Sequence, residues 1–165
     1  MIFGLSTGSF TLIHVILGLM GIFAGLAVFA EKVAAKRLKG WNVVFLVTTI
    51  LTSVTGLFFH SPFGPARVIG IISLVILAIV LVTLFGRRLA GAWRVIYVIS
   101  ALLALNLNGF VCVIQAFQKV SFLQALAPTQ SEPPFLVVQG VVVLAFLILG
   151  LLALRRFPSL SRALA

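Results

Sequence analysis

Acidic residues are almost missing from this chain. Its 165 residues include no aspartate and only two glutamates, Glu31 and Glu132. A mechanism that uses paired carboxylates as acid and base therefore has no residues to draw on. The single cysteine, Cys112, excludes an intramolecular disulfide. Phosphate-binding glycine loops, the HExxH and CxxC motifs and the GxSxG nucleophile motif are also missing, so the sequence predicts no catalytic residue.

Charged residues are few, and long apolar stretches take their place. Only 8% of the residues are charged, whereas 62% are hydrophobic and the mean hydropathy is +1.32. Too few polar residues remain to cover a water-soluble globule. Five stretches approach the roughly 20 residues that a membrane-spanning helix needs, namely residues 8–30, 41–59, 66–85, 93–117 and 135–154. The sequence therefore predicts an all-α integral membrane helical bundle with five transmembrane helices, in a single transmembrane domain over residues 1–165.

Positive charge is distributed unevenly among the segments that connect or flank these stretches. Of the 12 lysines and arginines, all except Arg67 and Lys119 lie in three alternate segments, residues 31–40, 86–94 and 155–165. By the positive-inside rule, this pattern places the amino terminus outside and the carboxyl terminus in the cytoplasm, with residues 118–134 as an outer loop. Cations at helix ends meet anionic lipid head groups, so the formal charge of +10 does not indicate nucleic-acid binding. We expect a multi-pass inner-membrane protein whose partners are the lipid bilayer and either a second copy or a larger membrane complex.

Small and polar residues follow one face of each of the first two predicted helices. They are His14, Gly18, Gly21 and Gly25 in the first helix, and Thr49, Ser53, Gly56 and His60 in the second. Both sets have intervals of four, three and four residues, which places each set on one helical face. In an antiparallel pair, position 14 would then meet 60, 18 would meet 56, 21 would meet 53 and 25 would meet 49. Because small residues let membrane helices approach closely, the pattern predicts a tightly packed hairpin.

His14 and His60 lie at the open end of this predicted hairpin, and the pairing places them at similar depth. Two imidazoles there can share a proton, bind a metal ion, or hold a haem or quinone head group. Haem between these two helices meets a geometric objection, because the macrocycle needs the helices apart where the glycines draw them together. The alternatives are structural hydrogen bonding by His14 and a helix that simply ends at His60.

Polar amides gather in the outer halves of the last two predicted helices. Asn106, Asn108 and Gln115 lie in the fourth stretch, and Gln139 lies near the start of the fifth. They predict either a ligand cavity between helices or a set of interhelical hydrogen bonds. In the outer loop, residues 119–127 are amphipathic enough to form a short helix at the membrane surface.

Parts of the chain resemble known sequences. Residues 117–135, FQKVSFLQALAPTQSEPPF, together with residues 105–111, LNLNGFV, look like a group of small bacterial membrane proteins. The first hairpin, LIHVILGLMGIFAGLAVFAEK followed by LKGWNVVFLVTTILTSVTGLFF, is similar to the opening of bacterial membrane proteins in a domain-of-unknown-function family. Members pair a first-helix histidine and spaced glycines with a short basic loop. The resemblance implies a bacterial multi-span membrane protein and brings no activity with it.

Three functions are compatible with these residues. The first is a non-enzymatic structural or accessory membrane subunit, in which the polar side chains serve helix packing. The alternative is a redox or cofactor-binding membrane protein that uses His14, with or without His60, for haem, metal or quinone. The second alternative is a small transporter with its site in the outer polar cluster.

Overall fold

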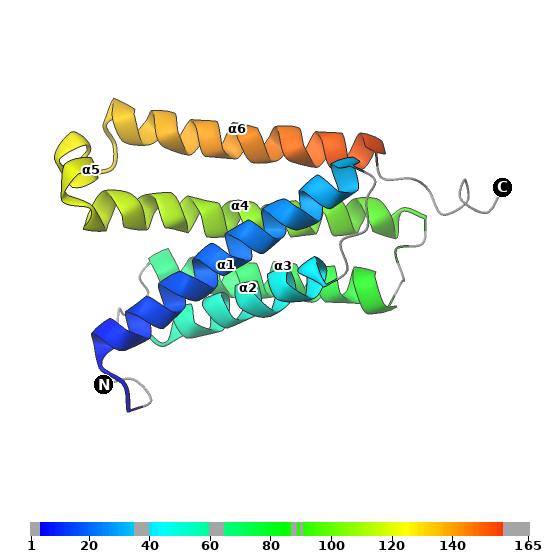
Figure 1. Ribbon diagram of the computed structural model, residues 1–165, viewed down its shortest axis with the longest axis horizontal. Coiled ribbons are helices and arrows are strands. Elements are labelled where there is room, and N and C mark those ends of the chain that lie inside the picture. Colours follow the sequence, from blue (N-terminus) through cyan, green and yellow to red (C-terminus); the bar gives the residue numbers. More distant parts are fainter. Residues whose placement is uncertain (1–3, 35–39, 60–64, 87–88, 90, 157–165) are drawn as a thin grey trace.

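The computed structural model describes residues 4–34, 40–59, 65–86, 89 and 91–156 of the chain. Helices account for most of these residues (Figure 1). In chain order they are α1 (Thr7–Ala34), α2 (Trp41–Leu57), α3 (Pro65–Leu81), the π-helical turn η1 (Val82–Gly86), α4 (Trp93–Lys119), α5 (Ser121–Leu126) and α6 (Pro133–Arg156). No β-strand occurs in the described part of the chain, so the all-α prediction is confirmed. The short helix expected in the outer loop is also confirmed, as α5.

Among the described residues, four helical segments are long and apolar enough to cross a membrane: α1, residues 67–86 of α3 and η1, α4, and α6. α2 is also apolar but has 17 residues. At a rise of 1.5 Å per residue α2 is roughly 25 Å long, somewhat shorter than a hydrocarbon core of about 30 Å. The chain is therefore a multi-pass helical membrane protein, while the crossing by α2 and the orientation of the termini stay predictions.

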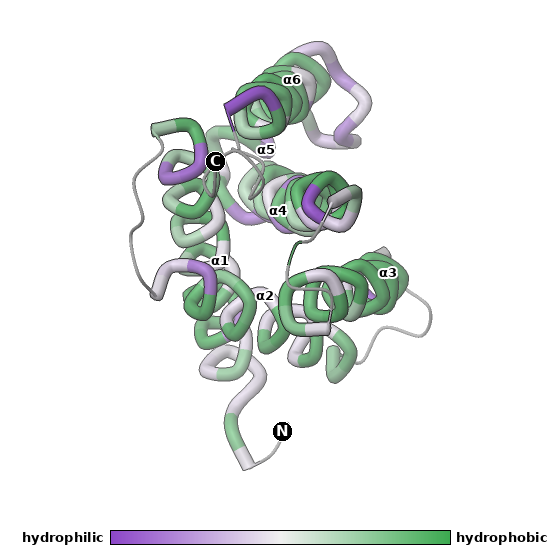
Figure 2. Tube along the Cα trace, turned by 90° about the vertical axis from the view of Figure 1, so that its right-hand side faces the viewer, coloured by the Kyte–Doolittle hydropathy of each residue, from purple (hydrophilic) through white to green (hydrophobic). Residues whose placement is uncertain are grey.

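α4 lies at the centre of the bundle. It packs against α3, α6 and α1, while α1 and α2 form the hairpin with the most extensive contacts (Figure 1). Viewed along the bundle, most residues of the helices are hydrophobic (Figure 2). Phe23 and Phe85, for example, expose 65% and 67% of their surface. An outer surface of this kind is suited to lipid rather than water.

Large buried side chains close the half of the bundle near the carboxyl end of α1. Val28, Phe29, Phe45 and Tyr97 are fully buried and belong to one continuous apolar core. The Tyr97 hydroxyl donates to Asn42 Oδ1 at 2.6 Å, which satisfies the polar end of a buried tyrosine. The space between helices that we describe below lies in the other half, toward the amino end of α1.

The glycines of α1 let α2 approach closely, as expected. A Cβ atom placed on Gly18 would lie 3.6 Å from Thr52 Cγ2, and one placed on Gly21 would lie 3.0 Å from Thr49 Oγ1. A Cβ atom on Gly25 would lie 3.0 Å from the ring of Phe45. The last two distances leave no room for a larger side chain without movement, so the small residues are a steric requirement.

The expected register of this hairpin is wrong by one helical turn. Thr49 faces Gly21 rather than Gly25, and Gly56 faces His14 rather than Gly18. Ser53, expected opposite Gly21, instead has its carbonyl oxygen 3.2 Å from the position of a Cβ on Gly70 of α3. A stripe that repeats every three to four residues presents the same surface after a slip of one turn, so spacing alone cannot select the register. His60, the expected partner of His14, lies outside the described residues.

Disulfide cross-linking distinguishes the two registers. In a Cys112→Ala background, Gly18→Cys combined with Thr52→Cys should form a disulfide under mild oxidant, because these two positions face each other. Gly18→Cys combined with Gly56→Cys should not, because Gly56 lies one turn, about 6 Å, further along α2. Non-reducing electrophoresis of both variants makes the comparison, and preferential cross-linking of the second pair would contradict the observed register.

Substitution of Gly21 tests the close packing itself. Gly21→Leu should destabilise the protein by roughly 1–3 kcal/mol or more, because its side chain would displace Thr49 and Asn108. Gly140→Leu on α6 is the matched control, since a Cβ there meets nothing within 4 Å. Thermal unfolding in the same detergent should separate the two variants, and equal melting temperatures would remove the packing argument.

The segment before α6 is organised by Glu132. Its carboxylate accepts hydrogen bonds from the Thr129 N–H at 3.1 Å, the Thr129 hydroxyl at 2.9 Å and the Ser131 N–H at 3.1 Å. Its carbonyl oxygen accepts the Phe135 and Leu136 N–H groups and so begins the helix. Desolvation opposes ionisation of the carboxylate, but the hydrogen bonds to Thr129 and Ser131 outweigh it and lower the pKa of Glu132 below its ordinary value of 4.5.

This shift predicts how the turn responds to acid. Because the pKa of Glu132 is lower in the folded than in the unfolded state, its stabilising contribution is fully present above the unfolded pKa and is lost as pH falls through the folded pKa. The amide resonances of Thr129 and Ser131 should therefore titrate with a midpoint below pH 4.5. Glu132→Gln should abolish this titration, and a midpoint at or above 4.5 in the unsubstituted protein would contradict the proposed hydrogen bonding.

Candidate functional site

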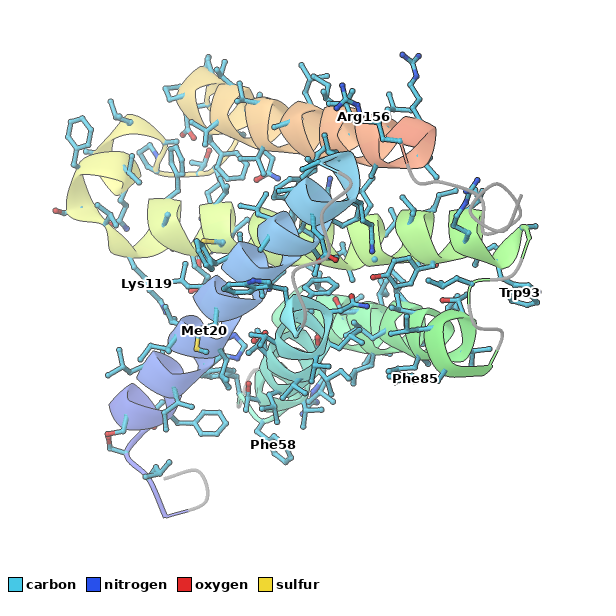
Figure 3. The ribbon with its side chains drawn as sticks, turned by 45° about the vertical axis from the view of Figure 1, so that its right-hand side comes forward. Met20, Phe58, Phe85, Trp93, Lys119 and Arg156 are labelled. Atoms are coloured by element: carbon cyan, nitrogen blue, oxygen red, sulfur yellow. The ribbon has the colours of Figure 1, made fainter. Side chains whose placement is uncertain are left out.

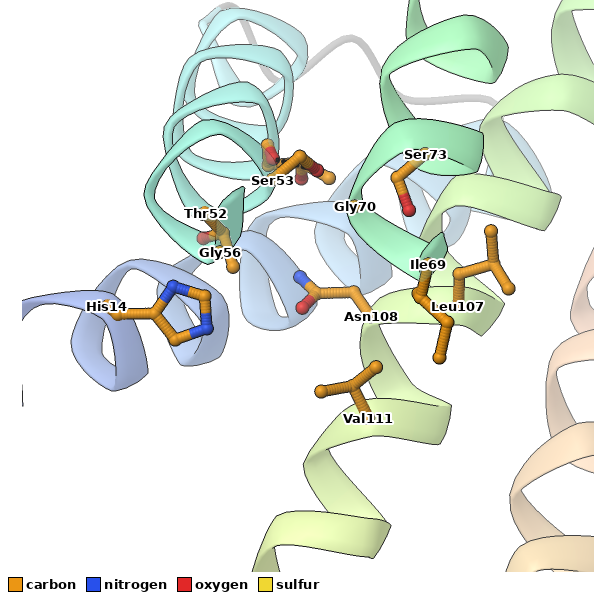
Figure 4. A pocket seen from close by; sticks show the side chains of 11 residues that line it. His14, Thr52, Ser53, Gly56, Ile69, Gly70, Ser73, Leu107, Asn108 and Val111 are labelled. Carbon is orange, nitrogen blue, oxygen red and sulfur yellow. Dashed lines mark hydrogen bonds between the residues drawn. The ribbon is translucent and has the colours of Figure 1, made fainter. Parts of the chain in front are cut away.

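Two cavities meet at His14 in the half of the bundle near the amino end of α1. The larger has a volume of about 220 Å³ and lies mainly between α1 and α4. The smaller, of about 50 Å³, lies between α2, α3 and α4 beside His14 (Figure 4). The residues that line both cavities are His14, Thr52, Asn108 and Val111. A side chain at this junction can therefore contact the contents of either cavity.

His14 is held in place by Thr55 of α2. Its Nδ1 lies 2.8 Å from the Thr55 hydroxyl oxygen, and its ring packs edge-on against Phe59 with 5.1 Å between centroids. The Thr55 hydroxyl also lies 2.7 Å from Leu51 O, the carbonyl one turn earlier in α2. These contacts fix the imidazole from one side, and Figure 4 shows the ring extending from α1 toward Asn108 and Val111.

Asn108 joins α4 to α1 at the same level. Its amide Nδ2 donates to the Gly18 carbonyl oxygen at 3.1 Å. The approach depends on missing side chains, because a Cβ atom on Gly21 would lie 2.9 Å from Nδ2. One N–H of the amide group is used in this bond, which leaves a second N–H and the carbonyl oxygen available for a ligand.

The larger cavity is largely apolar, with a few polar side chains in its lining. Aliphatic walls come from both helices, namely Val15, Leu19, Ile22, Val111 and Ala116. Cys112, Gln115 and Lys119 complete the α4 side. Lys119 is the last residue of α4, and its side chain extends on the side of α1 (Figure 3). The arrangement is suited to a largely apolar molecule that carries hydrogen-bonding groups.

The smaller cavity is lined by hydroxyl groups. Ser53 donates its hydroxyl to Thr49 O and Thr52 to Thr48 O, each at 2.8 Å, so both are satisfied within α2. Thr49 is 2% exposed, and its own hydroxyl has no hydrogen-bond partner within the described residues. The lining contains no lysine, arginine, aspartate or glutamate. The cavity therefore offers no counter-charge to an ion, and its size is that of a few water molecules.

Of the amides predicted to form a ligand cavity, Asn108 and Gln115 line the larger one. Asn106 and Gln139 line neither of the two cavities. Gln139 is nevertheless buried in α6, and its amide nitrogen and oxygen lack a hydrogen-bond partner among the described residues. Gly25 lies deeper in the bundle, against Leu105 and Phe45. The structure thus brings His14 together with two of the four amides.

Sequence reasoning missed Thr52, which lines both cavities, and Thr55, which contacts His14. Thr48, Thr52 and Thr55 have the same four-three spacing as Thr49, Ser53 and Gly56, displaced by one position. The signal that could have found them is the density of hydroxyl residues in α2, which supplies two adjacent polar stripes rather than one.

The described residues contain no group of three or more His, Cys, Asp and Glu side chains that could hold a metal ion. A haem shared by His14 and His60 depends on the pairing of positions 14 and 60. The observed register does not support that pairing, because His14 lies beside Thr55 and Gly56. Besides the Thr52 hydroxyl and the Cys112 thiol, the polar groups that line the larger cavity are one imidazole, two amides and one ammonium group. These groups hydrogen-bond a ligand more readily than they coordinate a metal.

The fold and the larger cavity define a class, a multi-pass helical membrane protein with a largely apolar cavity between its helices. Comparison with protein-family models, curated proteins and solved structures finds no match to the chain.

Proposed function

We propose that the chain is a five-span bacterial inner-membrane protein, with its amino terminus outside and its carboxyl terminus in the cytoplasm. The alternation of basic segments supports this orientation. α2 is apolar and packs antiparallel to α1, which supports a crossing by α2 as the second span. In this orientation both cavities lie in the outer half of the membrane. The resemblance of the first hairpin to bacterial membrane proteins of unknown function agrees with this proposal.

Within that frame, we propose a non-enzymatic accessory membrane subunit that binds a lipid-soluble cofactor of the quinone class between α1 and α4. The observation that carries the proposal is the cavity of about 220 Å³ with aliphatic walls and His14, Asn108, Gln115 and Lys119 at its polar positions. A quinone head group is a flat apolar ring with two oxygens. It needs apolar walls and a few hydrogen-bonding groups, and the cavity offers both.

The choice of a binding role over catalysis follows from the residues available. The two glutamates of the chain, Glu31 and Glu132, do not line either cavity, and there is no aspartate. His14, Cys112 and Lys119 are the titratable residues in the lining of the larger cavity, and none of them has a carboxylate partner there. A subunit that holds a cofactor for a larger membrane complex needs only the groups that are present.

A binding experiment tests this proposal. Short-chain benzoquinone and naphthoquinone derivatives, titrated into detergent-purified protein, should raise its melting temperature saturably, because a ligand that binds only the folded state stabilises it. Val111→Phe should fill the cavity and abolish the shift. Val95→Phe on the same helix is the matched control, since Val95 is 38% exposed and lies outside the cavity lining, and it should retain the shift.

Two results would contradict the proposal. If neither quinone class shifts the melting temperature, or if Val111→Phe leaves the shift unchanged, the cavity does not bind quinones. The polar residues would then serve helix packing, as in a purely structural subunit.

A further inference from the structure

The hydrogen-bond polarity at His14 selects one oxidation state of such a ligand. We infer that the cavity binds the reduced hydroquinone form more tightly than the oxidised quinone form, because His14 presents an acceptor and not a donor to it. This inference rests on the proposed function and names which partner of the redox couple the site holds. It follows from the contacts of Thr55 in two steps.

The first step locates the hydrogen of the Thr55 hydroxyl group. Its oxygen lies 2.7 Å from Leu51 O and 3.0 Å from Thr52 O, both within α2. Two oxygens at 2.7 Å repel unless a hydrogen lies between them, so the hydroxyl donates to Leu51 O. The 2.8 Å contact with His14 Nδ1 must then be a bond that Thr55 accepts. Nδ1 therefore carries the hydrogen.

The second step concerns the other ring nitrogen of His14. In a neutral imidazole one nitrogen donates and the other accepts, so a protonated Nδ1 leaves Nε2 with a lone pair. The ring extends toward Asn108 and Val111, which line both cavities (Figure 4). A hydroquinone hydroxyl can donate to this lone pair. A quinone carbonyl oxygen has no hydrogen to give and would meet the lone pair as a second acceptor.

The other polar groups of the cavity do not reverse this selection. The amides of Asn108 and Gln115 can both donate and accept, so they bind a hydroxyl or a carbonyl oxygen. Lys119 donates to either oxygen. The Thr52 hydroxyl already donates to Thr48 O at 2.8 Å, so it too offers only lone pairs to a ligand and adds to the preference that His14 sets. One hydrogen bond gained in the reduced form corresponds to a preference of about tenfold, which for a two-electron couple raises the midpoint potential of the bound ligand by about 30 mV.

The experiment compares the affinities of one short-chain benzoquinone and its hydroquinone, measured anaerobically on the full chain in the same detergent. The unsubstituted protein should bind the hydroquinone about tenfold more tightly. Thr55→Val removes the acceptor that fixes the Nδ1–H tautomer, so the ratio of the two affinities should fall clearly below that of the unsubstituted protein while binding persists. Thr55→Ser keeps the hydroxyl and should restore the preference. Ratios compared between variants cancel the different partitioning of the two forms into detergent.

Thr11→Val is the matched control. Thr11 lies one turn before His14, its hydroxyl donates to Thr7 O at 2.8 Å, and it lines neither cavity, so this variant should keep the full preference. Equal binding of both forms by the unsubstituted protein, or tighter binding of the quinone, would overturn the inference and leave the proposed function standing. Failure to bind either form would overturn both. A Thr55→Val variant that keeps the full preference would show that the tautomer is not the cause.

Discussion

The arrangement of this protein depends on one steric constraint, the lack of a side chain at Gly21. A Cβ atom there would lie 3.0 Å from Thr49 Oγ1 of α2 and 2.9 Å from Asn108 Nδ2 of α4. Three helices therefore meet at a point where any side chain larger than that of glycine would displace Thr49 and Asn108. In a membrane, where lipid competes with helix contacts on equal terms, such close approach is the main source of helix association.

The close approach at Gly21 sets the register of the hairpin, and the register decides which polar groups lie beside the cavities. With Thr49 against Gly21, the next turns of α2 place Thr55 beside His14. The hydrogen bond between them orients the imidazole toward the cavities. The same close approach brings Asn108 within 3.1 Å of the Gly18 carbonyl oxygen. His14 and Asn108 would be costly in hydrocarbon without hydrogen-bond partners. Each is hydrogen-bonded to a neighbouring helix and also lines the cavities.

The sequence was sufficient for the helices and for the close packing of the first two, because apolar length and glycine spacing are local patterns. It was not sufficient for the register, since Thr48, Thr52 and Thr55 form a second stripe that spacing cannot rank against Thr49, Ser53 and Gly56. The sequence also could not predict the hydrogen-bond partner of Asn108, because that partner is a backbone carbonyl oxygen and has no sequence signature. Gln115 and Gln139 are both amides near the α5 end of their helices, yet only a three-dimensional arrangement shows that Gln115 lines the larger cavity and Gln139 does not.

The most direct test of this account is the tautomer of His14 in the membrane-embedded protein. Solid-state nuclear magnetic resonance of ¹⁵N-labelled histidine side chains distinguishes a protonated ring nitrogen from one with a lone pair, and a His14→Gln sample assigns the signals against His60. The account predicts a neutral imidazole with the hydrogen on Nδ1 and a lone pair on Nε2. A hydrogen on Nε2 would contradict it, because His14 would then present a donor to the cavity.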